Sequence, residues 1–212
     1  MYTPARGRLI TIEGIDGAGK TSVAQALLDA LRARGIDVVL LREPGGVELS
    51  ERVRALVKDP ALTVGARAEA LLYAAARAQL VEESVGPRLA AGTWVLLDRF
   101  VDSSLAYQGA GRGLGVEPIR QLNRFATGDL APDRTLLLSL RPALARARAH
   151  DRAGAPDRLE REDERFFERI ADAYLELARL EPSRIATIDA GGTPAQVLEQ
   201  ALDAIADLLD QP

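Results

Sequence analysis

The sequence contains no cysteine, a single histidine and only 4% aromatic residues. The absence of cysteine excludes disulfides, thiolate nucleophiles and cysteine-based zinc sites, and it fits a reducing compartment. One histidine, His150, cannot build a histidine-cluster metal site. No run of about 18 apolar residues occurs, and the first residues lack the apolar core of a signal peptide. The sequence therefore predicts a soluble, cytoplasmic protein with no membrane partner.

An excess of charge of one sign is also lacking, because Lys and Arg number 27, Asp and Glu number 31, and the net charge is -4. Such a balance produces no field that favours a nucleic-acid backbone, so no nucleic-acid partner is expected and any phosphate chemistry must be local. A length of 212 residues with 47% hydrophobic residues predicts one domain, spanning 1–212, with a sizeable buried core.

Short β-branched or leucine-rich runs alternate along the chain with longer alanine-rich stretches of helical periodicity. This alternation is typical of βαβ units and predicts an α/β fold with a parallel sheet. The predicted strands are Arg8–Glu13, Asp37–Leu41, Trp94–Asp98, Thr135–Leu140 and Arg184–Ile188. The predicted helices are Thr21–Arg34, Ser50–Val57, Ala66–Ala91, Pro118–Thr127, Pro142–Ala149, Glu164–Leu180 and a last helix that opens at Thr193.

Glycine and proline mark three further features of the chain. Pro87 is expected to bend the long helix, and a helix starting at Ser103 is expected to be interrupted by the glycine-rich segment YQGAGRGLGVEP. The segment HDRAGAPDRLERED is polar and dense in Arg, Asp, Gly and Pro. We predict that it forms a mobile lid at about 149–163.

The first predicted strand is followed by a segment with the spacing Gly, four residues, Gly, Lys and Thr. Glycines in such a loop present successive backbone N–H groups to phosphates, and the following helix adds its positive N-terminus. Because only two of the 27 basic residues are lysines, the motif arises by chance in roughly one such chain in a thousand. The predicted ATP-binding residues are Gly14, Ile15, Asp16, Gly17, Ala18, Gly19, Lys20 and Thr21.

Two of these side chains have predicted roles, and a neighbouring strand adds two more. Lys20 is expected to reach the β- and γ-phosphates, and Thr21 to ligate Mg²⁺. The third predicted strand ends in Asp98 and Arg99, at the sheet edge beside the loop. Asp98 is placed to hold Mg²⁺ and its water, and the planar guanidinium of Arg99 to bind two phosphate oxygens. A surface ion pair is the structural alternative.

Two features that the sequence lacks limit the possible acceptors of the γ-phosphoryl group. A guanine-nucleotide switch needs an Asn-Lys-x-Asp segment, but the only asparagine, Asn123, is followed by arginine. A DNA-bound ATPase is expected to show a basic stripe, which the acidic balance does not offer. The sequence therefore favours a small-molecule acceptor.

The chain resembles bacterial thymidylate kinases in five collinear segments, namely TIEGIDGAGKT, LLREPGG, LLYAAARAQLVEE, LLDRFVDSSLAYQG and DRLE. The resemblance covers nearly the whole chain. It implies the three-layer P-loop kinase fold, with a five-stranded parallel sheet flanked by helices, in a homodimer. It also implies transfer of the γ-phosphoryl group of Mg²⁺-bound ATP to dTMP, giving dTDP for dTTP biosynthesis. A kinase for another deoxynucleotide or nucleoside, and a nucleotide-binding regulatory module, are the alternatives.

The resemblance assigns roles around the acceptor. It places Asp16 at the 3′-hydroxyl of the deoxyribose, Tyr73 in a stack on thymine, and Arg77, one helical turn later, at a base carbonyl. A half-buried helix pair is the structural alternative for Tyr73 and Arg77. The implied dTMP-binding residues are Asp16, Arg54, Tyr73, Arg77, Arg99, Ser103, Ser104, Tyr107 and Gln108.

The helix after Asp98 carries the second half of the implied acceptor pocket. Ser104 and Gln108 are one turn apart and are expected to share a base-recognition face. Tyr107 is implied to lie against the sugar, where its ring would occupy the space of a 2′-hydroxyl; a core aromatic is the alternative. Glu43-Pro44 falls where the family often has an unusual proline peptide geometry, and Ser139 stands where the family commonly has an acid.

The phosphate-binding loop has no arginine between its glycines, which resembles the bacterial subtype whose catalytic arginine comes from the lid. A positive charge near the γ-phosphate stabilises the transition state of phosphoryl transfer. Arg158 aligns best with that role and Arg152 is the second candidate, and a solvated charged loop is the alternative. The implied catalytic residues are Lys20, Asp98, Arg99, Arg158 and Arg152, and the implied metal ligands are Thr21 and Asp98.

Overall fold

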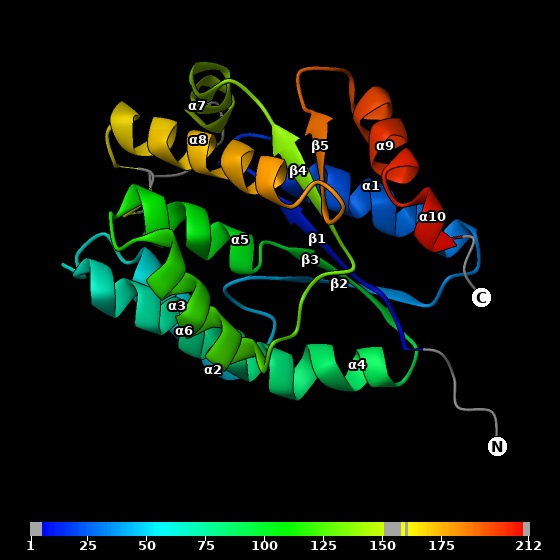
Figure 1. Cartoon of the computed structure of the whole chain (residues 1–212), viewed down its shortest axis with the longest axis horizontal. Coiled ribbons are helices and arrows are strands. Elements are labelled where there is room, and N and C mark those ends of the chain that lie inside the picture. The colour runs from blue at the N-terminus through cyan, green and yellow to red at the C-terminus, as the bar shows by residue number, and fades with distance from the viewer. Residues whose placement is uncertain (1–5, 151–157, 160, 210–212) are drawn as a thin grey trace.

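The computed structural model describes residues 6–150, 158, 159 and 161–209. Five strands form one sheet in which every neighbouring pair is parallel, in the order β2-β3-β1-β4-β5 (Figure 1). The predicted five-stranded parallel sheet is therefore confirmed. The strands are β1 (Leu9–Glu13), β2 (Val38–Arg42), β3 (Trp94–Asp98), β4 (Arg134–Ser139) and β5 (Ile185–Asp189).

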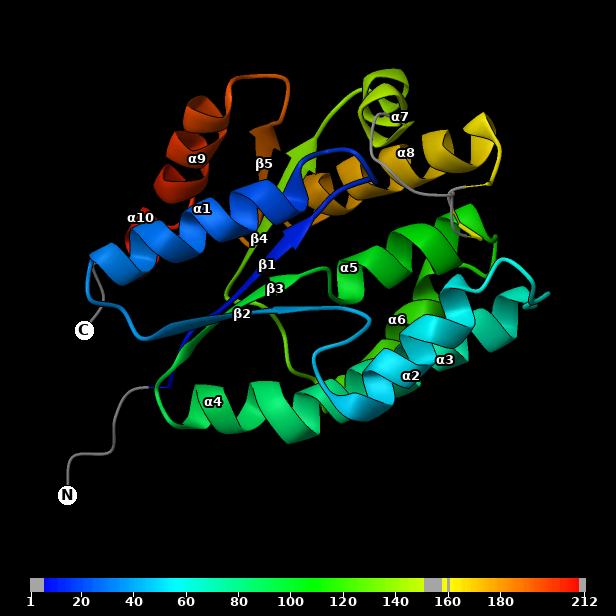
Figure 2. The same cartoon turned by 180° about the vertical axis from the view of Figure 1, so that it is seen from behind.

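Helices cover both faces of the sheet. On one face, α1 (Lys20–Ala33) and α9 (Pro194–Asp203) pack on the strands (Figure 2), and α10 (Ala206–Leu209) follows α9. On the other face lie α4 (Gly86–Ala90), α5 (Val101–Ser104) and α8 (Glu164–Leu180). The remaining helices are α2 (Glu48–Lys58), α3 (Ala66–Leu80), α6 (Val116–Thr127) and α7 (Pro142–His150). The layers are therefore helix, sheet and helix, as predicted.

The central strand β1 carries apolar side chains on both faces, which explains why helices cover both faces of the sheet. All five of its residues are buried, because it pairs with β3 on one side and with β4 on the other. A strand buried on both faces reads as a nearly continuous apolar run, as LITIE does. Its one interior hydroxyl, Thr11 Oγ1, is satisfied by Thr135 Oγ1 of β4 at 2.8 Å.

The long predicted helix is divided, but earlier than its proline suggests. The chain runs from α3 through a π-helical turn, η1 (Val81–Val85), into α4. Pro87 has no N–H to donate, and it stands in the first turn of α4, where a helix tolerates it. The wider turn therefore lies before the proline.

The glycine-rich segment after β3 interrupts its helix, as predicted, but later than the first glycine of the segment suggests. Helix α5 continues directly into a second π-helical segment, η2 (Leu105–Gly111). A Cβ on Gly111 would lie 2.8 Å from Phe166 of α8, and one on Gly109 would lie 3.1 Å from Cα of Val116. The glycines serve close packing against neighbouring helices, and the chain breaks only after Gly111.

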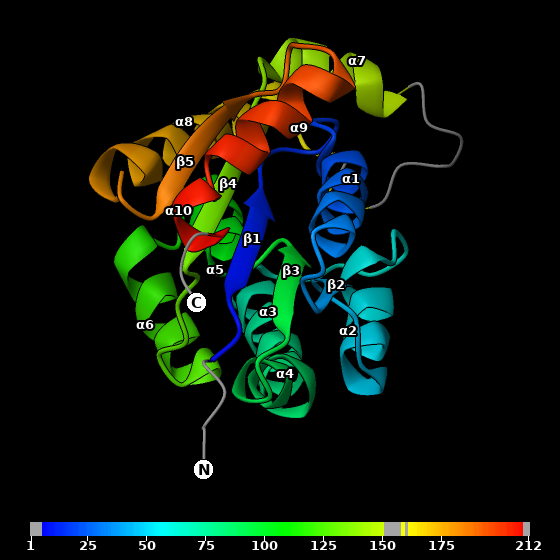
Figure 3. The same ribbon diagram turned by 90° about the vertical axis from the view of Figure 1, so that its right-hand side faces the viewer.

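The carboxyl ends of the strands form one edge of the sheet. The register sets Ile12 and Arg42 beside Asp98, so β1, β2 and β3 end side by side. Figure 3 shows the connection between β1 and α1 at this edge. Ligands of open parallel sheets bind at such an edge. Within the described residues, no helix is long and apolar enough to cross a membrane.

A largely buried ion pair connects the residue before β5 with α5. Arg184, just before β5, donates to both carboxylate oxygens of Asp102 in α5, at 2.7 and 2.9 Å. Thr135 Oγ1 donates to Asp102 as well, at 3.2 Å. Removing one partner of such a pair leaves the other charge buried and uncompensated.

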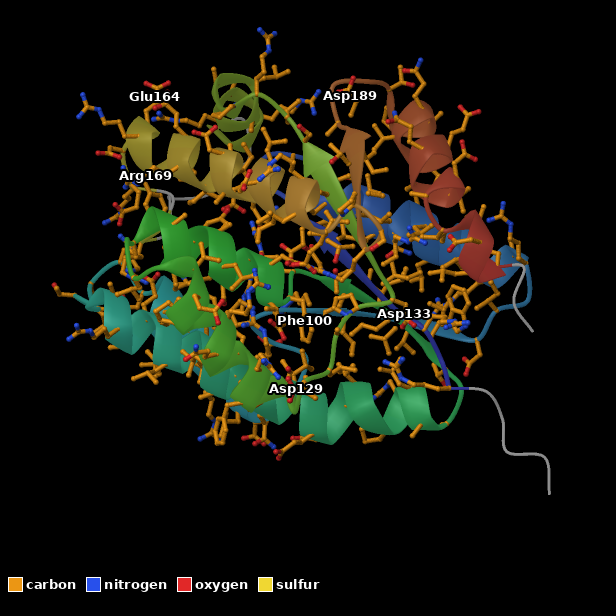
Figure 4. All side chains as sticks on the ribbon, in the orientation of Figure 1. Phe100, Asp129, Asp133, Glu164, Arg169 and Asp189 are labelled. Carbon is orange, nitrogen blue, oxygen red and sulfur yellow. The ribbon has the colours of Figure 1, made fainter. Side chains whose placement is uncertain are left out.

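We predict that Asp102→Ala lowers the free energy of unfolding by about 3 kcal/mol, because the Asp102 carboxylate is buried and Arg184 loses its main partner. Urea denaturation measures this change. The matched control is Arg124→Ala in α6, which removes an exposed pair with Asp129, labelled in Figure 4, and should leave the midpoint unchanged. Equal midpoints for the two variants would contradict a structural role for the Asp102 pair.

Candidate functional site

The phosphate-binding loop leaves β1 and enters α1 at the sheet edge. Ile15 and Ala18 anchor it, since both side chains are buried in the core. Gly17 has a φ of +89°, and a Cβ there would lie 1.9 Å from the carbonyl oxygen of Ala145 in α7. Only glycine fits this approach, which lets the loop backbone fold tightly in front of the α1 N-terminus.

Lys20, the first residue of α1, turns back into the loop. Its Nζ donates to the carbonyl oxygens of Gly14 and Ile15 at 3.0 and 2.9 Å. Burial lowers the pKa of Lys20 to about 8, and the positive charge of Arg99 adds to this effect, while Asp16 opposes it. The Lys20 side chain is thus fixed in the loop, and it loses its proton more readily than an ordinary lysine.

Thr21 and Asp98 meet across the boundary between α1 and β3. The hydroxyl of Thr21 donates to Asp98 Oδ2 at 3.1 Å, so the two predicted metal ligands lie together. No group of three or more His, Asp or Glu side chains that could hold a metal occurs in the described part of the chain. Mg²⁺ typically takes one or two protein oxygens and completes its shell with water and substrate phosphate. A hydroxyl and a carboxylate fit that requirement.

Asp16 in the loop forms a hydrogen-bonded cluster with Arg99 and Tyr107. Arg99 Nη2 lies 2.6 Å from Asp16 Oδ1, and the Tyr107 hydroxyl donates to Asp16 Oδ2 at 3.2 Å. Burial alone would raise the pKa of Asp16, but the charges of Arg99 and Lys20 outweigh it and hold the pKa well below its usual range. Asp16 is therefore an ionised hydrogen-bond acceptor.

Arg99 reaches this cluster from an unusual backbone conformation. Its φ is +71°, a region that costs a non-glycine residue free energy and that is often found at functional sites. The guanidinium also donates to Gly14 O and Ser103 Oγ, both at 3.2 Å, and it lies over the Tyr107 ring at 5.1 Å. These contacts hold a positive charge at the mouth of the loop.

One cavity of about 490 Å³ lies in front of the loop and brings most of the predicted residues together. Predicted residues that line it are Asp16, Gly19, Lys20, Thr21, Arg54, Tyr73, Arg77, Asp98, Arg99, Ser103, Ser104, Tyr107 and Gln108. Residues that line it without having been predicted are Ser22, Arg42, Glu43, Pro44, Lys58 and Leu159. The position of Arg42, Glu43 and Pro44 at the end of β2 could have predicted their place in the cavity, because neighbouring parallel strands end at one edge of the sheet.

Arg77 lies in the cavity wall with its guanidinium bound to the protein. Its Nε donates to Glu43 Oε2 at 2.7 Å, and Nη2 lies 2.6 Å from the same oxygen. Nη2 also donates to the carbonyl of Phe100, which is labelled in Figure 4, while Nη1 donates to Ser104 and Asn123. These contacts engage every N–H of Arg77, so its predicted contact with a base stays a prediction.

Glu43 is the ionisable residue that sequence reasoning missed beside Arg77. The Glu43-Pro44 peptide is cis, which confirms the unusual geometry expected at that position. Burial raises the pKa of Glu43 to about 7, although the Arg77 charge opposes the shift. Within the described residues its buried Oε1 has no hydrogen-bond partner. Arg54, also in the wall, donates to the Pro44 carbonyl at 2.9 Å.

Ser103 faces a buried carboxylate as well as the cavity. Its hydroxyl donates to Glu13 Oε2 at 2.6 Å, and the Tyr174 hydroxyl donates to the same oxygen at 2.9 Å. Burial and the nearby charge of Asp102 raise the pKa of Glu13, while Ser103 and Arg99 oppose this. The role of Ser103 in the structure is therefore to satisfy Glu13, and its predicted contact with dTMP is untested.

Arg158, the first-choice lid arginine, lies between α2 and α3. Its Nη2 donates to Glu69 Oε2 at 2.6 Å and its Nε to the carbonyl of Val57 at 3.0 Å. Neighbouring Leu159 lines the cavity, whereas Arg158 does not. Its predicted contact with the γ-phosphate would require it to leave Glu69. Arg152 lies outside the described residues, so its predicted role is untested.

Comparisons with known proteins agree on one family. The family model described as thymidylate kinase matches residues 12–201. A thymidylate kinase of Rhizorhabdus wittichii is 49% identical over 206 residues, covering 96% of this chain and 99% of that protein. One of Deinococcus radiodurans is 50% identical over 186 residues, covering 88% and 90%. One of Lactobacillus delbrueckii is 44% identical over 203 residues, covering 94% and 96%.

The lowered pKa of Lys20 predicts that nucleotide binding takes up a proton. At about pH 8.5 roughly three quarters of Lys20 is neutral in the free protein, given a pKa of about 8. Polyphosphate favours the charged form, so ATP binding raises the pKa and draws a proton from the buffer. Calorimetry in two buffers of different ionisation enthalpy measures the uptake. Lys20→Arg, which stays charged, should bind ATP without it; equal uptake by both proteins would assign the proton to another group.

Proposed function

The chain belongs to the thymidylate kinase family and phosphorylates dTMP with ATP as donor, and we propose that it does so as a magnesium-dependent enzyme through the residues around the phosphate-binding loop. The product is dTDP, on the route to dTTP. The observation that carries the proposal is the shared cavity, which is lined at one end by Lys20 and Thr21 and elsewhere by Tyr73 and Gln108. A donor phosphate and an acceptor phosphate can therefore meet inside it.

Charge cancellation is the main chemical task of this cavity. The attacking phosphate oxygen of dTMP is already ionised, so the reaction needs no strong general base. Two anions must instead be held in line while their repulsion is neutralised. Lys20 and Arg99 supply fixed positive charges beside the loop, and Arg42 and Arg54 line the same cavity. We propose that these side chains hold the two phosphates for in-line transfer.

Thr21 and Asp98 are the residues that we propose for magnesium. Their oxygens are already 3.1 Å apart, and hard oxygen ligands are what Mg²⁺ prefers. Held by these two residues, the ion would supply positive charge that offsets the negative charge developing on the transferred phosphoryl group. Asp98 would act through its carboxylate, directly or through a bound water, and Thr21 through its hydroxyl.

The acceptor is proposed to lie in the part of the cavity that is lined by Asp16, Tyr73 and Tyr107. Tyr73 offers a ring on which thymine can stack. Asp16, kept ionised by Arg99, can accept a hydrogen bond from the 3′-hydroxyl of the deoxyribose. Tyr107 is only 5% exposed and packs edge-on against Phe166, and the part of its side chain that lines the cavity would lie beside the sugar.

Further parts of the proposal concern organisation. We propose that 1–212 form one kinase domain with a lid at about 149–163 and that the protein acts in the cytoplasm, where its nucleotide substrates occur. A homodimer is proposed as well. The resemblance to bacterial thymidylate kinases, which are usually homodimers, supports this part of the proposal.

Phosphorylation of dTMP is tested by coupling ADP release to a spectroscopic readout across a panel of nucleoside monophosphates. We expect the highest kcat/KM with dTMP. Lys20→Ala should abolish turnover, because it removes the positive charge that contacts the donor phosphates. The melting temperature should stay close to that of the wild type. Turnover that depends on another monophosphate but not on dTMP would overturn the substrate assignment. An active, ATP-saturable Lys20→Ala protein would contradict the role of the loop.

The lid assignment predicts that Arg158→Ala lowers kcat by about 100-fold or more with little change in the Kd of dTMP, because the guanidinium acts on charge that develops during transfer. Single-turnover kinetics and dTMP titration separate the two effects. Arg152→Ala is the matched variant. A crippled Arg152→Ala protein beside a normal Arg158→Ala protein would assign the catalytic role to Arg152.

A further inference from the structure

Ser104 and Gln108 line the cavity one turn apart, and each is hydrogen-bonded on its protein side to a buried charged residue. Ser104 contacts Arg77, and Gln108 contacts Glu69. The side chains of both Ser104 and Gln108 are buried, at 3% and 2% exposure. The polarity that each shows to the cavity therefore depends on the charged neighbour behind it.

Gln108 has its amide orientation set by Glu69. Gln108 Nε2 lies 2.8 Å from Glu69 Oε1. Burial would raise the pKa of Glu69, but hydrogen bonds from Arg112, Gln108 and Arg158 outweigh it and lower the pKa, so the group is a carboxylate. A carboxylate only accepts hydrogen bonds, so the NH₂ end of the amide must face it.

The opposite end of the Gln108 amide remains for a ligand. No described residue donates a hydrogen bond to Gln108 Oε1. The fully buried polar atoms that lack a partner do not include this oxygen either. The side chain lines the cavity. An almost fully buried amide thus presents a hydrogen-bond acceptor to the cavity.

Ser104 shows the complementary polarity. Arg77 Nη1 donates to Ser104 Oγ at 2.9 Å, and a guanidinium has no acceptor atom with which to take the serine proton. No described residue accepts that proton in return, so the hydroxyl is left to donate into the cavity. The wall therefore carries a donor at Ser104 and an acceptor at Gln108.

We propose that Glu69 is a positioning residue that makes the base pocket select 4-keto pyrimidines, by holding Gln108 so that Oε1 accepts the N3–H of the base while Ser104 donates to its O4. Thymine and uracil carry this acceptor and donor at ring positions 4 and 3. Cytosine carries the reverse, an amino group and an unprotonated nitrogen. The inference rests on the proposed function, because it reads the base of the acceptor nucleotide.

A purely structural role is the rival account of Glu69. Its carboxylate also pairs with Arg112 at 3.1 Å and with Arg158 at 2.6 Å, so it joins α3, η2 and the segment before α8. Loss of these pairs would lower stability whatever the base. A change in base preference, however, is expected only when the partner of Gln108 changes.

The test compares dTMP with 5-methyl-dCMP, which differ only at ring positions 3 and 4. In Glu69→Gln the new amide can donate to Gln108 Oε1, so Gln108 can turn and present its NH₂ group to the base. We expect the ratio of kcat/KM for dTMP over 5-methyl-dCMP to fall by about 10- to 100-fold. The same ratio taken from Kd values by calorimetry should fall in parallel.

Arg112→Met is the matched control. It removes the Arg112 ion pairs with Glu69 and Glu162 and the contact of the guanidinium with the Phe166 ring, but it leaves the Glu69 carboxylate on Gln108. We expect a lower melting temperature and an unchanged substrate ratio. Gln108→Met removes the acceptor oxygen without changing the ion pairs of Glu69, and it should lower the ratio of kcat/KM values as Glu69→Gln does. It therefore tests the inference even if Glu69→Gln does not fold.

The outcomes separate the two proposals. An unchanged ratio in folded Glu69→Gln or in Gln108→Met overturns the inference, and so does an equal fall in Arg112→Met. If the wild type does not phosphorylate dTMP, the proposed function fails, and the Kd ratio still decides whether Glu69 sets base preference. A fall confined to Glu69→Gln and Gln108→Met supports the inference.

Discussion

A buried carboxylate at the end of the central strand, that of Glu13, joins the parts of the site. A charge-bearing group without water must be satisfied by hydrogen bonds inside the protein. Glu13 accepts from the backbone N–H of Phe100 and Ser103 at 2.7 and 3.2 Å, and from the hydroxyls of Ser103 and Tyr174. One residue thereby ties β1 to the turn after β3 and to α8. Glu13, the residue before the phosphate-binding loop, thus determines how the chain turns after β3.

The conformation of Arg99 follows from that turn. With the amides of Phe100 and Ser103, which follow it, directed at Glu13, Arg99 adopts a φ of +71° and its guanidinium reaches Asp16 and Gly14 O. The same turn leads into α5, where Ser104 meets Arg77. Charges in this site are therefore arranged in layers: carboxylates and guanidinium groups beneath the cavity satisfy one another, and they set which donors, acceptors and charges face the ligand.

Much of the fold could be predicted because its local signals agree with its tertiary structure. The strand Trp94–Asp98 and the helix Glu164–Leu180 have the predicted bounds, and Thr193 caps the last long helix through a reciprocal pair with Gln196. The helix after Ser103 extends through the first glycines of its segment, although glycine in a helix is ordinarily unfavourable. Gly111 is tolerated there since any side chain would collide with Phe166, a residue distant in sequence.

The sequence by itself determined the phosphate-binding loop, the strand endings that surround it and the residues that gather at one sheet edge, because these depend on short spacings and on the rule that parallel strands end together. Only the tertiary structure decided what each side chain contacts. Nothing in the spacing of Arg158 or Arg77 indicates that one pairs with Glu69 and the other with Glu43. Such pairings arise between residues far apart in the chain, where burial requires each charge to find a partner, and so they depend on how the helices pack.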